Sequence, residues 1–347
     1  MILPHTHTAA LLLMFFSLFC WGSWANTLKR AGKWRFELYY FDFAIGLAVV
    51  ALILAFTFGS LGYDGFSLLD DLMSAGKRQW VYGFAGGVIF NLGNLALVAA
   101  ISVVGMAVAF PMAFACAIIV GALLGYAVQP FAHPALLVLG CAILVLSILV
   151  NSAVYRNLQV QRHEALARSG KAKSTRRPSS IKGVLLSLAS GLMLALFAPV
   201  VELGRNGEIP MGPYSIALLF AAGAFFSTFI FNLFFMNLPV DGEPLELAEY
   251  FQGRPTEHLL GMFGGALWIC GMVASYAAMS APDGHQIGAA AGYAVLQGSA
   301  VISALWGIFA WKEFAGADSR IKAFAVLTLV LFGCGLGLVS LAPIYVR

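Results

Sequence analysis

Uncharged polar side chains are the residues of this chain best suited to bind a ligand. Asn91 and Asn94 are three residues apart in one long apolar stretch, and Tyr293 and Gln297 are four apart in another. Residues at these spacings share one face of a helix. Amide groups offer both donors and acceptors, which suits a small polar ring or a sugar. Hydrogen bonding between membrane helices is the alternative use of the same side chains.

Three tryptophans extend this set. Trp21 and Trp24 end the first apolar stretch, just before a basic segment, and Trp268 lies inside a later one. An indole offers a flat apolar wall for a ring, whereas tryptophan at the end of an apolar helix also anchors it at the membrane surface. We therefore predict a substrate site from these residues, with anchoring left open for the first two. The predicted set is Trp21, Trp24, Asn91, Asn94, Trp268, Tyr293 and Gln297.

Carboxylates inside apolar stretches are the candidates for proton coupling, because charge is costly there and its presence often marks function. Asp42 lies one turn into the second stretch, where the N-terminus of a helix also explains it. Glu202 lies near the end of the sixth and could pair with Arg205. We expect Glu313, just beyond the ninth stretch, to be a helix-end group. No Lys or Arg occupies the middle of a predicted span, which favours a neutral substrate.

The sequence offers no motif for an enzyme or a metal site. HExxH, GxSxG and the phosphate loop are absent, and the five cysteines form no CxxC pair. We therefore expect no catalytic residues, no metal and no cofactor. An integral-membrane enzyme or a purely structural membrane protein is the least favoured class.

Composition indicates an integral membrane protein. The chain is 61% hydrophobic and 10% charged, whereas soluble domains carry about 25% charged residues. A net charge of +4 provides no basic face for nucleic acid. A bilayer core needs about 20 apolar residues per helix. By that measure we predict an all-α fold with ten spans, at 8–28, 38–60, 80–102, 105–127, 134–155, 181–203, 213–236, 258–280, 286–311 and 321–343.

Basic residues predict the orientation of these spans. The loops on one side hold 16 Lys and Arg, and the other side holds 4. Because basic loops stay in the cytoplasm, we expect both termini outside and the 156–180 connector inside. We expect the protein in the inner (plasma) membrane of a bacterium. The connector separates a first five-helix repeat, 1–155, from a second, 181–347.

The two halves resemble each other. GGVIFNLG at 86–93 matches GGALWICG at 264–271, which places Phe90 opposite Trp268 in the alignment. Five helices are an odd number, so the copies must insert in opposite orientations. Inverted repeats of this kind build transporters that work by alternating access. Gly333 and Gly337 form a GxxxG step that could support a homodimer.

Several stretches resemble the ureide permeases. They are CWGSWANTLKRAG at 20–32, YYFDFAIG, FNLGN at 90–94, LALFAPVV at 194–201 and LWGIFAWKEF at 305–314. The second half is also similar to the bacterial glucose/rhamnose uptake group. Both groups belong to the drug/metabolite transporter superfamily, with two five-helix repeats. The resemblance implies proton-linked import of allantoin, uracil, xanthine or a similar neutral heterocycle.

We therefore predict a secondary transporter that imports a small neutral polar solute, with Asp42 as the first candidate for the proton-linked group and Glu202 as the second. Its partners would be the substrate, the lipid bilayer and protons. Two alternatives keep the same fold. One is a sugar permease of the glucose/rhamnose type, and the other is an exporter of drugs or metabolites.

Overall fold

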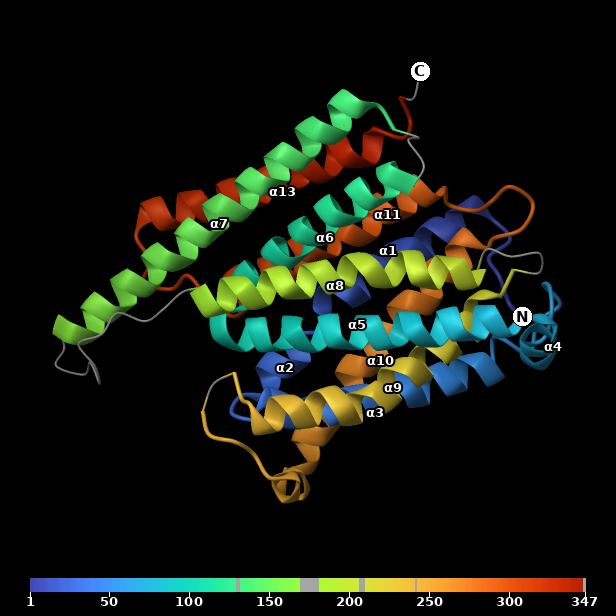
Figure 1. Ribbon diagram of the computed structural model, residues 1–347, viewed down its shortest axis with the longest axis horizontal. Coiled ribbons are helices and arrows are strands. Elements are labelled where there is room, and N and C mark those ends of the chain that lie inside the picture. The colour runs from blue at the N-terminus through green and yellow to red at the C-terminus, as the bar shows by residue number, and fades with distance from the viewer. Residues whose placement is uncertain (129–131, 169–180, 206–209, 241, 346–347) are drawn as a thin grey trace. The chain divides into compact units, whose positions relative to one another are not determined.

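The protein is built from membrane-length helices. The computed structural model describes residues 1–128, 132–168, 181–205, 210–240 and 242–345, and within them it contains helices and no strand (Figure 1). Ten helical segments in the described residues are long and apolar enough to cross a membrane. The ten predicted spans are therefore confirmed in number, and the chain is an integral membrane protein. The segments are His7–Ala31, Phe36–Phe56, Lys77–Val104, Met106–Val128, Pro134–Arg168, Ile181–Arg205, Pro213–Asn237, Pro255–Met279, Gly292–Ala310 and Ser319–Leu341.

Two of the ten segments are interrupted. The first consists of α1 (His7–Ser23) and α2 (Asn26–Ala31), and the ninth ends in a short π-helix, η2 (Trp306–Ala310). The other elements are α3 (Phe36–Phe56), α4 (Leu68–Ser74), α5 (Lys77–Val104), α6 (Met106–Val128), α7 (Pro134–Arg168), α8 (Ile181–Arg205), α9 (Pro213–Asn237), the 3₁₀ helix η1 (Leu247–Gln252), α10 (Pro255–Met279), α11 (Ala289–Gln297), α12 (Ser299–Leu305) and α13 (Ser319–Leu341).

The fifth helix is longer than predicted. Its predicted end was residue 155, but α7 continues to Arg168. The added residues, RNLQVQRHEALAR, are rich in Leu, Gln, Arg, Glu and Ala, which favour helix. The first part of the predicted 156–180 connector is therefore helical, and residues 169–180 lie outside the described part of the chain.

Packing groups the chain into two compact units. One contains Met1–Leu95 and Met193–Ser299, and the other contains Ala96–Leu192 and Ala300–Arg347. The division falls within α5 and α8, so each unit draws on both predicted halves. The boundary predicted at 156–180 concerns a repeat in the sequence rather than packing, and it stays a prediction.

In the first unit, α10 packs closely along α3. Glycines make this approach feasible: a Cβ at Gly265 would collide with the backbone carbonyl of Phe43, and one at Gly261 would meet the Cβ of Asp42. Small residues allow helix backbones to come together in this way. The tight crossing brings Asp42 directly against the first two turns of α10.

In the second unit, Glu313 caps a helix that lies far away in the sequence. Its carboxylate accepts hydrogen bonds from the backbone N–H groups of Met106, at 2.9 Å, and Ala107, at 2.8 Å. These groups begin α6 and have no partner within the helix, and the helix dipole favours a negative charge there. Gly105, with φ +85°, brings the chain up to the carboxylate. Glu313 was expected as a group at the end of its own span, but its carboxylate instead caps the start of α6.

Replacing Glu313 tests this cap. Glu313→Ala removes two charge-assisted hydrogen bonds, and we expect the free energy of unfolding to fall by about 1–3 kcal/mol. Thermal unfolding of the purified protein in mild detergent measures the change. Glu164→Ala, on the exposed side of α7, is the matched control and should shift the free energy by no more than about 0.5 kcal/mol. Equal losses in the two variants would contradict the capping role.

Candidate functional site

An aromatic cluster in the first unit is centred on Trp268. The Trp21 ring stacks on it at 5.3 Å between centroids, and the Phe220 ring lies nearly parallel to it at 5.4 Å. Phe90 approaches to 4.0 Å. The Nε1 of Trp21 also donates a 3.0 Å hydrogen bond to the backbone carbonyl of Trp268. Of the predicted site residues, Trp21 and Trp268 are therefore brought into direct contact, with Phe90 beside them.

Trp24 has a different environment. Its side chain is buried and packs at 5.1 Å on Phe43 of α3, where α1 passes into α2. A tryptophan that anchors a helix at the membrane surface keeps its ring at the headgroup level. The ring of Trp24 instead lies in the protein interior, where it supports the bend between α1 and α2.

The two asparagines are both buried in contacts between helices. The Nδ2 of Asn91 donates to the hydroxyl of Ser227 at 2.8 Å, and its Oδ1 accepts from Thr228 at 3.3 Å. The Nδ2 of Asn94 donates to the hydroxyl of Tyr40 at 3.2 Å. These bonds join α5 to α9 and to α3. The geometry fits the alternative interpretation, in which the amides hold helices together.

Gln297 differs from the asparagines in having an amide oxygen available. Its Oε1 is buried and has no hydrogen-bond partner among the described residues. A buried acceptor without a partner costs free energy, and such groups call for an explanation. Helix α11, which carries both Gln297 and Tyr293, packs against α1 and α10. Leu296 belongs to an apolar cluster that Trp21 also contacts. Gln297 therefore directly follows Leu296, whose apolar cluster is in contact with Trp21.

Asp42 contacts two residues that the sequence did not single out. The hydroxyl of Tyr250 donates to its Oδ1 at 2.6 Å, and the Nδ1 of His258 lies 2.9 Å from its Oδ2. Asp42 is on α3, Tyr250 on η1 and His258 on α10. We call these three residues the Asp42 cluster. No sequence signal pairs residues this far apart, although a histidine one turn into an apolar helix resembles the placement of Asp42 itself.

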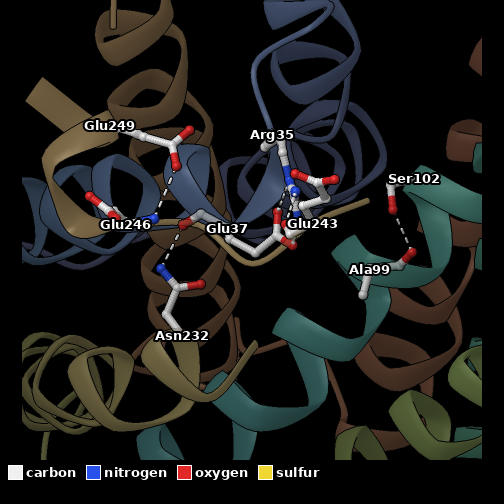
Figure 2. A network of polar contacts seen from close by, with 8 residues as sticks. All are labelled: Arg35, Glu37, Ala99, Ser102, Asn232, Glu243, Glu246 and Glu249. Carbon is white, nitrogen blue, oxygen red and sulfur yellow. Dashed lines mark hydrogen bonds and ion pairs between the residues drawn. The ribbon is translucent and has the colours of Figure 1, made fainter. Parts of the chain in front are cut away.

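A second network joins α3 and α9 to the loop before η1 (Figure 2). Arg35 donates to the buried carboxylate of Glu37 at 2.6 Å and to the backbone carbonyl of Glu243 at 2.6 Å. Asn232 donates to the backbone carbonyl of Glu37 at 2.6 Å. The start of α3, the end of α9 and the loop before η1 are thereby tied together. Helix η1, which carries Tyr250, begins four residues after Glu243.

Glu202 forms the ion pair expected from its spacing. Its Oε2 lies 3.2 Å from the guanidinium of Arg205, which also donates to Ser280 and lies over the Tyr276 ring at 4.5 Å. The Glu202 side chain is 49% exposed, compared with 2% for Asp42. Glu202 is therefore the less isolated of the two candidate carboxylates.

The described residues form no metal site, and the groove that they form beside α3 is mostly apolar. Across the described residues, no three His, Cys, Asp or Glu side chains gather closely enough to hold a metal ion. A groove of about 210 Å³ lies between α3, α9 and η1, but mostly apolar side chains line it, including Phe41, Phe225 and Phe229. Such a surface gives a polar ring little to bind.

The role of the asparagines can be tested through stability. Asn91→Ala removes the two hydrogen bonds that join α5 to Ser227 and Thr228, whose hydroxyls keep their bonds to carbonyls within α9. We expect the free energy of unfolding to fall by about 1–3 kcal/mol, the worth of two buried hydrogen bonds. Thermal unfolding in detergent measures it. Asn237→Ala removes an amide from the exposed end of α9 and should change the free energy by less than about 0.5 kcal/mol. A stable Asn91→Ala variant that loses only ligand affinity would restore Asn91 to the substrate site.

Comparison with known proteins points to one family. Residues 39–183 match the family model for ureide permeases. The chain is 24% identical to ureide permease 4 of Arabidopsis thaliana, over 96% of this chain and 96% of that protein. It is 24% identical to ureide permease 2 of the same plant over 93% of each, and 23% identical to a probable ureide permease A3 of Vigna unguiculata over 90% of this chain and 97% of that protein.

The fold also has a match among solved structures. One crystal structure contains a chain that is 16% identical and has a TM-score of 0.51, with coverage of 95% of this chain and 96% of that chain. This likeness concerns the fold alone. The resemblance to the glucose/rhamnose uptake group and to the wider superfamily stays a prediction. In sequence, the chain is similar to the ureide permeases over almost its whole length.

Proposed function

We propose that this chain is a ureide permease, a secondary transporter that imports a ureide such as allantoin or a related neutral heterocycle. The observation that carries the proposal is the similarity to proteins named ureide permeases, which extends over 96% of both chains in one case. The relatives reported above are all ureide permeases or probable ones. That agreement favours a ureide over a sugar or an exported drug.

The aromatic cluster and Gln297 supply the chemistry that a ureide needs. A ureide ring is flat, so it can stack on an indole such as Trp21 or Trp268. It also carries N–H groups, and the buried Oε1 of Gln297 is an acceptor with no partner among the described residues. Tyr293 shares the helix of Gln297. We assign ring stacking to the two tryptophans and hydrogen bonding to Gln297, and we give Asn91, Asn94 and Trp24 supporting positions around them.

We further propose that transport proceeds by alternating access of two inverted repeats and is coupled to protons. Of the two carboxylates, Asp42 is the better candidate to take part in coupling, because Glu202 is half exposed and paired with Arg205. A homodimer through α13 is supported by an open surface: apart from neighbouring backbone of α13 itself, no described atom lies within 4 Å of a Cβ placed at Gly333 or Gly337. The relatives named above are plant proteins, so the bacterial inner membrane stays a prediction.

Transport is tested with radiolabelled allantoin in proteoliposomes. We expect saturable exchange of internal for external allantoin, and stimulation of net uptake by an inward proton gradient. Gln297→Ala should raise the half-saturation concentration about 2- to 10-fold, the worth of one neutral hydrogen bond. Asn237→Ala, an exposed amide on α9, is the control and should behave like the unmodified protein. Absence of exchange with allantoin, uracil and xanthine would contradict the proposed function.

Orientation is tested with single cysteines in a variant that lacks the five native ones. His5→Cys should react with a membrane-impermeant maleimide on intact cells, because the N-terminus is proposed to lie outside. Ser174→Cys, in the proposed cytoplasmic connector, should react only after permeabilisation. Five spans separate the two positions, so labelling of both on the same side would contradict the inverted repeat.

A further inference from the structure

Both carboxylate oxygens of Asp42 are occupied. Tyr250 donates to Oδ1 and His258 lies against Oδ2, and the Asp42 side chain is only 2% exposed. Water therefore has little direct access to this carboxylate. The side chain of His258 is 24% exposed. A proton bound for this cluster therefore meets the imidazole before it meets Asp42.

The contact with Asp42 distinguishes the two ring nitrogens of His258. Because Nδ1 faces a carboxylate oxygen at 2.9 Å, we assign the ring proton to Nδ1, which then donates to Asp42. Nε2 is then the atom with a free lone pair in the neutral ring. A Cβ at Gly253 would lie 2.6 Å from Nε2 and 2.5 Å from the Trp34 ring, so Gly253 and Trp34 border this nitrogen and glycine adds no side-chain atom there. The ring is thus oriented by Nδ1, and Nε2 is the nitrogen left to accept a further proton.

The neighbouring titratable groups do not compete for the proton. Burial, followed by the hydrogen bond to Asp42, raises the pKa of Tyr250 well above its ordinary value, so it stays a donor. Tyr39, the neighbour on α3, shares a 2.6 Å hydrogen bond with Thr27. On α10, Glu257 is paired with Arg254 at 2.6 Å. Histidine is the side chain that most often changes charge near neutral pH, and His258 is the histidine in contact with Asp42.

We propose that His258 is the proton-binding residue of this transporter, and that Asp42 and Tyr250 position it. A proton from water bonds to the Nε2 lone pair and later leaves from the same atom. Without this proton on Nε2 the Asp42 cluster carries a net charge of −1, and with the proton the cluster is neutral. Because a net charge buried in a membrane protein is costly, the neutral form is the one free to change conformation. This proposal rests on the proposed function and adds the atom where the coupled proton binds.

A pair of variants separates a proton-binding role from a structural one. His258→Gln keeps an N–H donor for Asp42 but leaves the cluster permanently at −1. We expect it to lower both allantoin exchange and proton-driven accumulation about tenfold. Asp42→Asn combined with His258→Gln makes the cluster permanently neutral. This double variant should recover exchange to within about threefold of the unmodified protein, while an imposed proton gradient no longer stimulates uptake.

The control is His285→Gln, a histidine of the loop between α10 and α11, which should leave exchange and proton stimulation unchanged. Proton-driven accumulation in His258→Gln equal to that of the unmodified protein would overturn the proposal. So would a double variant that folds but is inactive, or one that still responds to the gradient. Neither result is compatible with a neutral cluster being the mobile form, and if the double variant does not fold, the resonance measurement below decides the case.

A second measurement needs no substrate, and it decides the case even if the unmodified protein does not exchange allantoin. Nitrogen-15 resonances of the imidazoles are followed in detergent between about pH 5 and 8, where histidine changes charge. His258→Gln identifies the signal of His258. We expect Nε2 to gain a proton across this range while Nδ1 keeps its own, and Asp42→Asn to displace the midpoint. An Nε2 signal that stays constant with pH would refute His258 as the proton site, whatever the transport assays give.

Discussion

The cost of placing charge in a bilayer determines how this protein uses its polar residues. Charged side chains inside the first unit are held by partners close to the ends of helices. Glu37 is buried against Arg35, and Asp42 is held by His258 and Tyr250. Deeper in the helices the polar groups are neutral amides and hydroxyls, such as Asn91 with Ser227. A group whose charge can change therefore stands out, because each change alters the energy of the surrounding structure.

The helical architecture was largely predictable from the sequence, because a lipid-spanning helix must be long and apolar. That requirement identified ten spans, and the same ten appear among the described residues. Hydropathy could not predict where a helix ends once it leaves the membrane. Helix α7 continues to Arg168 because its polar continuation favours helix and is held in place, with Arg162 donating to the carbonyl of Glu313.

The candidate site was less predictable. Trp21 and Trp268 were found from residue type alone, and they stack on each other. The asparagines were found by the same reasoning, yet their amides join helices, because spacing shows which residues share a face and not what that face meets. His258 was missed because 216 positions separate it from Asp42. Only the close crossing of α3 and α10, made by glycines, brings the two together.

The contact between Phe90 and Trp268 bears on the repeat that the sequence predicts. The two residues hold equivalent places in the paired motifs, and their rings are 4.0 Å apart. In a dimer with two-fold symmetry, a residue meets its own counterpart only at the axis. If the paired motifs descend from two separate chains, an ancestral dimer would have carried the same ring on both sides of that axis. Fusion of the two genes would then have freed one ring to become an indole while the other stayed a phenyl.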